Sequence, residues 1–509
     1  MALSDFVAAV VAVLRRRPSD LLPLYLLGIA IPAIIRVVPF LALGVAYLHL
    51  STTGRLEPIR THLTDLGSPP DPNADPDAFE AWASGLEPLV DQLVTPLVIA
   101  LAGVSLVVSV LLFAVLSAAV AAGQLSACYG RLRDTRGVLT GIDGAARFWR
   151  RFLGLFVLEL VCWVVVLGGV GVGTALLAGG ISAATGSGVF AIPVVLLGAF
   201  VAFFGVLVVR ALFAFAPVAI VVDDASVFAS LRSVLRFVRA QPVNAAFYYV
   251  LAIGVLIGVA TVSGLFSLVN VVTVGSLLSA LIAMPALDLL KTAIYGGYRG
   301  RLRPPEPPTR SLRDGIRAGL RRGWQELVGF VRAHPGTHLF VVALGLLGFW
   351  MGWVAAGPFV GTFEASIAAR LEGELPPTMA ANLFGNNWLV ALTTAYAGAA
   401  FAIPAIVSLL FNGVSLGIYA RLEADPLELA AFVVPHGLLE IPAILIAGAL
   451  GISVGVTAWR TWRGNVGRTA LADTLERAFW VLIGIGIVLA IAAVLEGFVS
   501  PYYYRPFLS

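Results

Sequence analysis

Residues 189–218 read VFAIPVVLLGAFVAFFGVLVVRALFAFAPV, a long run in which Arg210 is the one charged side chain. About 20 apolar helical residues cross a hydrocarbon core about 30 Å thick, so this stretch is typical of a transmembrane helix. Of the 509 residues, 59% are hydrophobic and 12% are charged, whereas about a quarter are charged in an ordinary soluble domain. This composition excludes a soluble enzyme, a disordered tail and a nucleic-acid-binding module. It predicts an all-α, polytopic transmembrane helical bundle in the cell membrane.

The apolar runs predict about 11 spans, six in the first half of the chain and five in the second. They lie at about 21–50, 95–127, 152–179, 189–218, 243–267, 270–296, 338–359, 388–421, 431–459 and 478–499. The stretch 388–421 counts as two, because Pro404 removes a backbone donor near its middle and favours a tight helical hairpin. A single tilted helix with a re-entrant piece is the alternative for this stretch.

The distribution of basic residues predicts the orientation. With the N-terminus inside, 26 of the 33 Lys and Arg residues fall in inner segments and five in outer ones. Cytoplasmic loops carry such an excess, so we expect the N-terminus inside and, after an odd number of spans, the C-terminus outside. The net charge of +4 reflects this asymmetry and predicts no nucleic-acid partner.

The predicted outer loop 51–94 is acidic and rich in proline. Its acidic residues are Asp65, Asp71, Asp75, Asp77, Glu80, Glu87 and Asp91. A solvated loop accounts for them, and a site for a divalent cation or a positively charged partner is the alternative. Their spacing fits no metal-binding pattern.

The chain changes character near residue 303, where the proline-rich run 304–308 predicts an extended linker. We therefore predict a six-span module at 1–303 and, at 304–509, a basic helix followed by a five-span module. Basic amphipathic helices are expected at 311–332 and before the fifth span, and more weakly at the N-terminus. In the first, Leu312, Ile316, Leu320, Leu327 and Phe330 share a face; in the second, Phe228, Leu231, Leu235 and Val238 do. Such helices bind anionic lipids of the inner leaflet, or they form a docking surface for a cytosolic partner.

Ionisable residues within spans are costly, so each needs a partner or a function. The candidates are Arg36, Glu159, Arg210, Asp288, His436, Glu440 and Glu496. Arg36 and Arg210 with Glu159 are expected to form a structural ion pair in the first bundle.

The densest polar cluster lies in the second half. It comprises Asn386, Asn387, Asn412, Gly413, Gly417, His436 and Glu440. Gly413 and Gly417 form a small-residue face on which two helices approach closely, and asparagine amides can hydrogen-bond across such a contact.

His436 and Glu440 are four residues apart, so they share a helix face. A mutually satisfied pair, a proton or ion relay and half of a metal site are the alternatives. The sequence has no HExxH, Walker or Rossmann G-x-G-x-x-G pattern. We therefore expect no catalytic residues, no metal and no cofactor.

Residues 338–501 resemble the stage II sporulation protein M family. The motifs that carry the resemblance are Asn386-Asn387, Pro404, Asn412-Gly413-x-x-x-Gly417, His436-Gly437-x-x-Glu440-Ile-Pro-Ala, the glycines 448, 451 and 455, and Leu-Glu496-Gly-Phe. The resemblance implies five spans, no enzymatic activity of its own, and a membrane scaffold of the kind that recruits peptidoglycan-remodelling enzymes. The six-span module in front departs from the family, so the sporulation role is not transferred. The first half is loosely similar to the membrane region found beside some glycerophosphodiester phosphodiesterases.

The sequence thus predicts a non-enzymatic scaffold or assembly component for envelope or lipid-handling partners. Its expected contacts are the lipid bilayer, anionic inner-leaflet lipids and other membrane proteins, with self-association left open. The alternative is a transporter or channel for ions, lipids or small solutes that uses His436 and Glu440.

Overall fold

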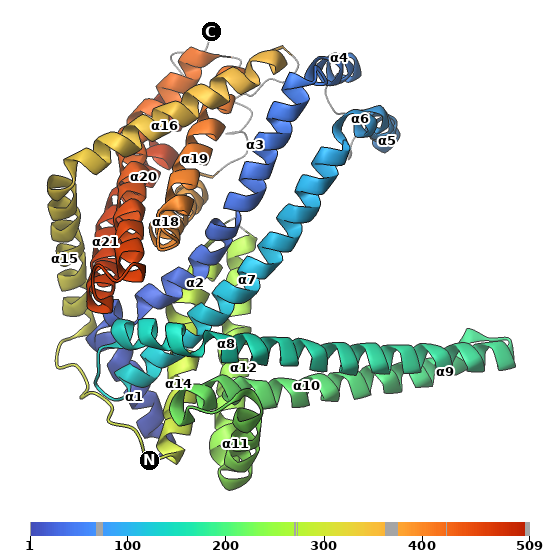
Figure 1. The fold of residues 1–509 in the computed structure, drawn as a ribbon, viewed down its shortest axis with the longest axis vertical. Coiled ribbons are helices and arrows are strands. Elements are labelled where there is room, and N and C mark those ends of the chain that lie inside the picture. Colours follow the sequence, from blue (N-terminus) through green and yellow to red (C-terminus); the bar gives the residue numbers. More distant parts are fainter. Residues whose placement is uncertain are drawn as a thin grey trace. The chain divides into compact units, whose positions relative to one another are not determined.

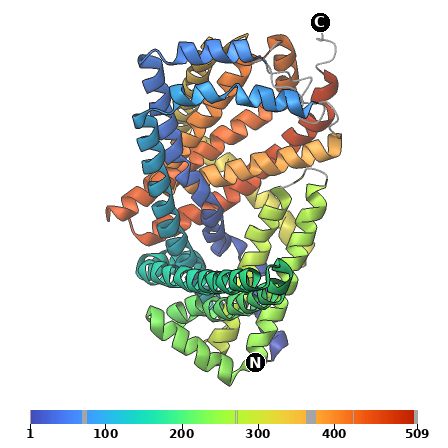
Figure 2. The same ribbon diagram turned by 90° about the vertical axis from the view of Figure 1, so that its right-hand side faces the viewer.

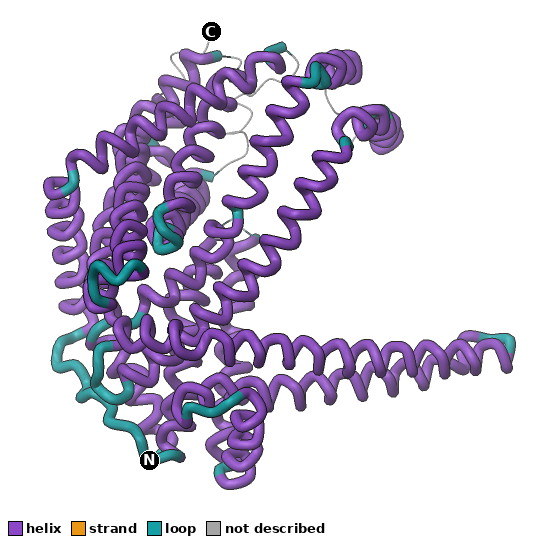
Figure 3. Tube along the Cα trace, viewed as in Figure 1, coloured by secondary structure: helices purple, strands orange, loops and turns teal. Residues whose placement is uncertain are grey.

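The computed structural model describes residues 2–67, 75–268, 271, 273–361, 375–423 and 425–503. Every regular element in this part of the chain is a helix, which confirms the all-α prediction (Figure 3). Ten of the described helices or helix pairs are long and apolar enough to cross a membrane. They are Leu22–Thr52, Pro96–Arg131, Gly137–Thr185, Gly188–Asp223, Pro242–Ser267, Thr273–Tyr298, Pro335–Phe359, Ile403–Leu422, Pro426–Trp462 and Arg468–Phe498.

The number of candidate spans is therefore ten and not the predicted eleven. The stretch around Pro404 does contain two helices, α18 (Pro376–Ala397) and α19 (Ile403–Leu422). They are joined by a turn in which Phe401 and Ala402 have positive φ, directly before Pro404. Helix α18 begins earlier than predicted, and its prolines and asparagines make it too polar to count as a candidate span.

The chain forms two compact units, each assembled from three stretches. The first comprises residues 1–28, 114–259 and 280–310, and the second comprises 29–113, 260–279 and 311–509. The predicted division at residue 303 separates two continuous stretches of sequence, whereas each compact unit combines three stretches. The two divisions describe different things, so the one at residue 303 stays a prediction. As predicted, residues 301–308 contain no helix.

The first unit packs around an aromatic core. Its helices are α1 (Leu3–Arg16), the start of α2 (Leu22–Ile35), the end of α7 (Pro96–Arg131), α8 (Gly137–Trp163), α9 (Gly169–Thr185), α10 (Ile192–Asp223), α11 (Val227–Ala240), most of α12 (Pro242–Ser267) and α14 (Met284–Tyr298). Short helical pieces lie at Pro18–Asp20, Val164–Gly168, Gly188–Ala191 and Ser279–Ala283. Phe237 is fully buried between Phe215, at a centroid distance of 5.0 Å, and Tyr295, at 5.4 Å.

Within this unit, α8 and α9 form one long arm of a helical hairpin whose other arm is α10 (Figure 1). Figure 2 shows the same hairpin foreshortened, in green. Gly205 of α10 lies against Val166, and Gly198 lies against Thr174, so the arms pack closely. Large apolar side chains such as Leu176 and Leu196 remain exposed along the hairpin, as lipid-facing residues of a membrane protein do.

The second unit contains the remaining helices. They are the end of α2, α3 (Val37–Thr52), α4 (Leu56–Leu66), α5 (Pro76–Ser84), α6 (Glu87–Leu93), the start of α7, the end of α12, α13 (Thr273–Leu278), α15 (Leu312–Ala333), α16 (Pro335–Ala356), the short helix Gly357–Phe359, α18, α19, α20 (Pro426–Trp462), α21 (Arg468–Phe498) and α22 (Ser500–Tyr503). Helices α15, α18 and α20 all pack against α21. Figure 1 shows α16 and α19 of this unit side by side, and they share its most extensive helix contact.

The amphipathic segments are helical, and the structure shows which of their side chains pack against other helices. Helix α15 buries Leu327 and Phe330, whereas Leu312, Ile316 and Leu320 are exposed. Helix α11 buries Ser230, Val234 and Phe237, and it exposes Phe228 and Leu235. Hydrophobic spacing identified the helices, but the positions of their neighbours select the buried face.

The acidic segment 51–94 folds into the short helices α4, α5 and α6 in its described part. Arg60 pairs with Glu57 of α4 at 3.0 Å. Among described residues this segment contains no group of three metal-ligand side chains, and Asp71 lies outside the described residues.

Candidate functional site

The candidate site lies on α20, a long helix that contains two prolines. The Asp425 side chain caps its N-terminus by accepting hydrogen bonds from the backbone N–H groups of Leu427 (2.8 Å) and Glu428 (3.1 Å). Pro435 and Pro442 lie inside the helix and bracket His436 and Glu440. Each proline removes one intrahelical hydrogen bond, so the helix continues here only because its neighbours support it.

The structure adds a third ionisable side chain, Glu496 near the end of α21. The distance from His436 Nε2 to Glu496 Oε1 is 3.7 Å, and both side chains are more than nine-tenths buried. One donor atom each from His436, Glu440 and Glu496 lies within 4.8 Å of the other two. Helices α20 and α21 thus bring one imidazole and two carboxylates to one point.

The other imidazole nitrogen has its own partner. His436 Nδ1 lies 3.0 Å from the Oγ of Ser500, the first residue of α22. When Nδ1 carries the proton and donates to Ser500, Nε2 is left as an acceptor that faces Glu496. The contact with Ser500 therefore orients the imidazole ring so that Nε2 faces Glu496.

The surroundings of the site are apolar. Phe432, one turn before His436, packs edge-on against the imidazole with ring centroids 5.3 Å apart. Helix α18 closes the same end of the bundle, because a Cβ on Gly497 would lie 2.8 Å from the carbonyl oxygen of Pro376. In such a setting charges interact more strongly than in water. The arrangement can hold a proton between carboxylates and imidazole, or bind a cation.

The remaining predicted residues of the second half do not join this group. Gly413 and Gly417 lie in the α16–α19 contact, where a Cβ on Gly413 would be 2.6 Å from the carbonyl oxygen of Gly345. Asn412 donates its amide to Ser408 O of its own helix at 2.7 Å, and Asn386 donates to the Asn387 side chain at 3.4 Å. The close approach of α16 and α19 therefore rests on glycines.

The predicted ionisable residues of the first half fall into two places. Arg210 pairs with Glu159 at 3.4 Å in the first unit, and its side chain is 68% exposed. Arg36 lies in the second unit, at the junction between α2 and α3.

Sequence reasoning did not identify the most buried ion pair of the first unit. Arg131 NH1 lies 3.2 Å from Asp20 Oδ2, with side chains 2% and 5% exposed. Asp20 Oδ1 also accepts the backbone N–H of Val138 in the first turn of α8, at 3.0 Å. These residues are far apart in sequence and adjoin arginine-rich stretches, so their local pattern indicated only an inner loop.

A second polar group of the first unit surrounds Asp288. It accepts a hydrogen bond from Tyr25 Oη at 2.8 Å and pairs with Lys291 at 2.8 Å. Tyr25 Oη also lies 3.3 Å from Cys128 Sγ. Lys291, the one lysine of the chain, is thus neutralised within its own helix.

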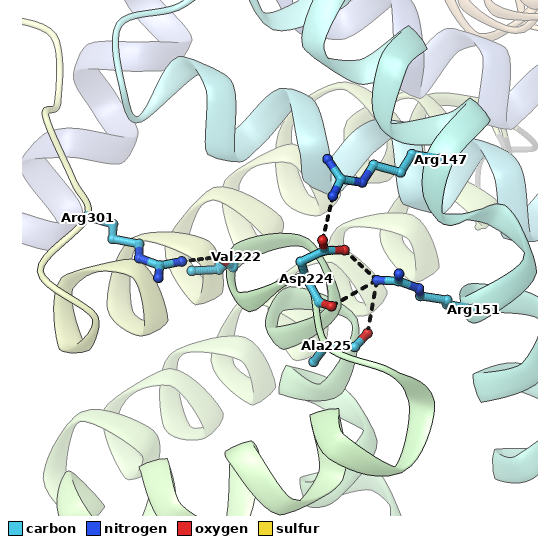
Figure 4. A network of polar contacts seen from close by, with 6 residues as sticks. All are labelled: Arg147, Arg151, Val222, Asp224, Ala225 and Arg301. Carbon is cyan, nitrogen blue, oxygen red and sulfur yellow. Dashed lines mark hydrogen bonds and ion pairs between the residues drawn. The ribbon is translucent and has the colours of Figure 1, made fainter.

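A third network joins the end of α10 to α8 (Figure 4). Asp224 accepts hydrogen bonds from Arg151 at 2.5 Å and from Arg147. The hydrogen bond from Arg151, followed by the positive charges of Arg147 and Arg151, lowers the pKa of Asp224. Arg301 donates to the Val222 carbonyl at 2.5 Å in the same region.

Comparison with known families assigns the C-terminal part of the chain. Residues 339–501 match the model of the family described as stage II sporulation protein M (SpoIIM). These residues form a SpoIIM domain. The match confirms the resemblance predicted at 338–501, and it contains His436, Glu440 and Glu496. With its ten apolar helices, the chain is a multi-pass membrane protein, and the family match covers its residues 339–501.

The SpoIIM match begins after the first module, and the likeness of that module to phosphodiesterase membrane regions stays a prediction. No curated protein and no solved structure matches the chain.

Proposed function

We propose that this protein is a non-enzymatic membrane scaffold that assembles or positions envelope or lipid-handling partners. The observation that carries the proposal is that α15, the helix that precedes the SpoIIM domain, is only partly covered by other helices. Its second half is fixed to α21, since Gly323 meets Gly484 with almost no space between the two backbones. Its first half presents side chains that no described residue of the second unit covers.

The exposed half of α15 has an amphipathic surface. Leu312, Ile316, Leu320 and Trp324, spaced four residues apart, form an exposed apolar stripe, which we call the α15 stripe. Arg313, Arg317 and Arg321 follow the stripe one position later and are also exposed. A stripe of this kind binds anionic lipid at the inner leaflet and can contact a partner at the membrane surface.

The packing of the SpoIIM domain supports a rigid platform. Gly398 lies against Gly451, and Gly455 lies against Ala402, so the α18–α19 turn is held directly against α20. Thr394 and Ser408 add a hydrogen bond of 2.8 Å across the hairpin. Close backbone packing limits relative motion of the helices, which suits a platform on which partners assemble.

Crosslinking mass spectrometry in native membranes tests the scaffold proposal. The variant Ile316→Asp/Leu320→Asp places two charges in the α15 stripe, and Gln325→Asp places one at an exposed position of the same helix outside it. We expect specific partners to be lost in the first variant and retained in the second. Crosslinks only to copies of the same chain, in wild type, would reject the proposal.

The buried group of His436, Glu440 and Glu496 favours transport as the second candidate function. Ionisable side chains within a membrane mark ion and proton pathways. This alternative predicts pH-dependent flux in proteoliposomes, followed with a pH-sensitive dye, that Glu440→Gln abolishes and Glu428→Gln, on the same helix, leaves intact. Flux that is unchanged in Glu440→Gln would reject the role of this cluster.

The packing of α18 supports eleven crossings with the C-terminus outside. Trp388 donates to Leu482 O and Tyr396 donates to Leu475 O, each at 3.1 Å, while Gly497 meets Pro376. Helix α18 thus runs antiparallel to α21 over its whole length of 22 residues. Neighbouring helices half-bury Asn382 and Asn387 and leave Asn386 exposed, and the packing along α21 allows α18 to serve as a span that hydropathy does not identify.

A further inference from the structure

We propose that His436, Glu440 and Glu496 bind a divalent transition-metal ion, with Zn²⁺ as the ion best suited to the ligand set. This inference does not depend on the scaffold function. Imidazole nitrogen and carboxylate oxygen are both common zinc ligands, and one histidine with two carboxylates provides three of them. Three protein ligands leave a further position for water.

The geometry fits one shared ion. Two ligand atoms bound at about 2.1 Å to a tetrahedral ion are about 3.4 Å apart. His436 Nε2 and Glu496 Oε1 are 3.7 Å apart, and a Glu440 oxygen completes a set whose members all lie within 4.8 Å of one another. Coordination of one ion requires these atoms to approach one another from at most 4.8 Å to about 3.4 Å.

Ser500 lies next to His436 in the position that a supporting residue has in zinc sites. A metal-bound histidine usually donates its second ring N–H to an oxygen atom, which fixes the tautomer and directs the other nitrogen to the ion. Ser500 Oγ, 3.0 Å from Nδ1, is in the position to accept that bond. Ser500 is fully buried, so this contact does not compete with bulk water.

Charge balance is compatible with a divalent ion at this site. Two carboxylates next to each other among apolar helices are costly unless positive charge offsets them. A divalent ion with two glutamates and a neutral histidine has no net charge. Protons shared among the three side chains can also reach neutrality, and this is the competing state that the experiment must separate from metal binding.

The test measures metal bound by the purified full-length protein in lipid nanodiscs. After exposure to Zn²⁺ and removal of free ion, elemental analysis is expected to give about one zinc per chain in wild type. Glu496→Gln and His436→Asn are each expected to lower the affinity at least tenfold. The matched controls Glu428→Gln and His334→Asn replace the same residue types elsewhere in the second unit and are expected to bind as wild type.

Two further measurements keep the test decisive if a ligand variant does not fold. Ser500→Ala retains all three ligands and is expected to weaken Zn²⁺ binding about tenfold or more, the usual effect of losing such a supporting contact. Co²⁺ in place of Zn²⁺ should give wild type the visible absorption of a four-coordinate site. Wild type without bound zinc, or with a Co²⁺ spectrum that persists in folded Glu496→Gln, would overturn the proposal and favour the proton-sharing state.

Discussion

Gly417 of α19 lies so close to Phe349 of α16 that a Cβ at position 417 would be 2.0 Å from the Phe349 carbonyl oxygen. Gly352 makes the reciprocal approach, since its Cβ would be 2.0 Å from the Val414 carbonyl oxygen. The two helices therefore touch backbone to backbone, and no side chain fits between them.

Gly417→Val is expected to disrupt the α16–α19 pair. The added side chain forces the helices apart, and overpacking of a filled contact costs about 1–3 kcal/mol or more. Thermal unfolding in detergent, followed by size-exclusion fluorescence, measures the effect as a lower melting temperature. Gly336→Ala is the control, because its added Cβ meets no atom within 4 Å apart from its chain neighbours and the nearby backbone of its own helix. Equal melting temperatures for both variants would refute the contact.

The Asp20–Arg131 pair is expected to be essential for folding of the first unit. Arg131→Met leaves the buried Asp20 carboxylate without its counter-charge, which costs about 3–5 kcal/mol at such sites. Arg239→Met, at an exposed position of α11, should change stability by about 0.5 kcal/mol or less.

A double-mutant cycle checks this pair. Asp20→Asn/Arg131→Met should be less destabilised than the sum of the two single variants, because neither charge is then left alone. Additive effects would show that the pair contributes no coupling energy.

The pH dependence of stability should include a contribution from Asp224. Its hydrogen bond to Arg151 and the nearby charges of Arg147 and Arg151 lower its pKa below the ordinary value of 3.8 in the folded state. A group with a depressed folded-state pKa stabilises the fold above its unfolded pKa, and this contribution is lost as the pH falls through the folded pKa. The side chain is 47% exposed, so solvent screening keeps the effect small.

Melting curves between pH 3 and pH 7 test this expectation. Asp224→Asn should melt below wild type at pH 5–7, and the difference should shrink below about pH 4. Arg150→Gln serves as a control, because Arg150 is outside the Asp224 network while Arg151 is in it. A difference between Asp224→Asn and wild type that is independent of pH would mean that the carboxylate charge is not responsible.

The proposed orientation can be read from cysteine accessibility. Single cysteines replace Asn465, in the turn between α20 and α21, and Asp77, in α5. An impermeant thiol reagent added outside intact cells should label position 77 and leave position 465 unlabelled until the membrane is opened. Labelling of position 465 from outside would contradict the proposed orientation, because it would place the turn between α20 and α21 outside the cell.

Several properties of this protein could be predicted from the sequence because they depend on local composition. A run such as 189–218 is apolar and long enough for a membrane helix whatever it packs against. Pro404 marked the hairpin between α18 and α19, and the spacing of Gly413 and Gly417 marked a helix contact surface. The SpoIIM motifs predicted the C-terminal domain to within one residue of its start.

The tertiary structure decided what depends on neighbours distant in sequence. Glu496 and Ser500 join His436 only because α20, α21 and α22 pack together, and Asp20 reaches Arg131 across more than 100 residues. The tertiary structure also decided which side chains of α11 and α15 pack against other helices, since hydrophobic spacing defines a stripe but not the helix that covers it. Helix α18 is too polar to be identified as a span by composition, and only the tertiary structure shows that it packs along α21. Hydropathy is a property of each segment alone, whereas burial, ion pairing and ligand sets are properties of segments brought together by folding.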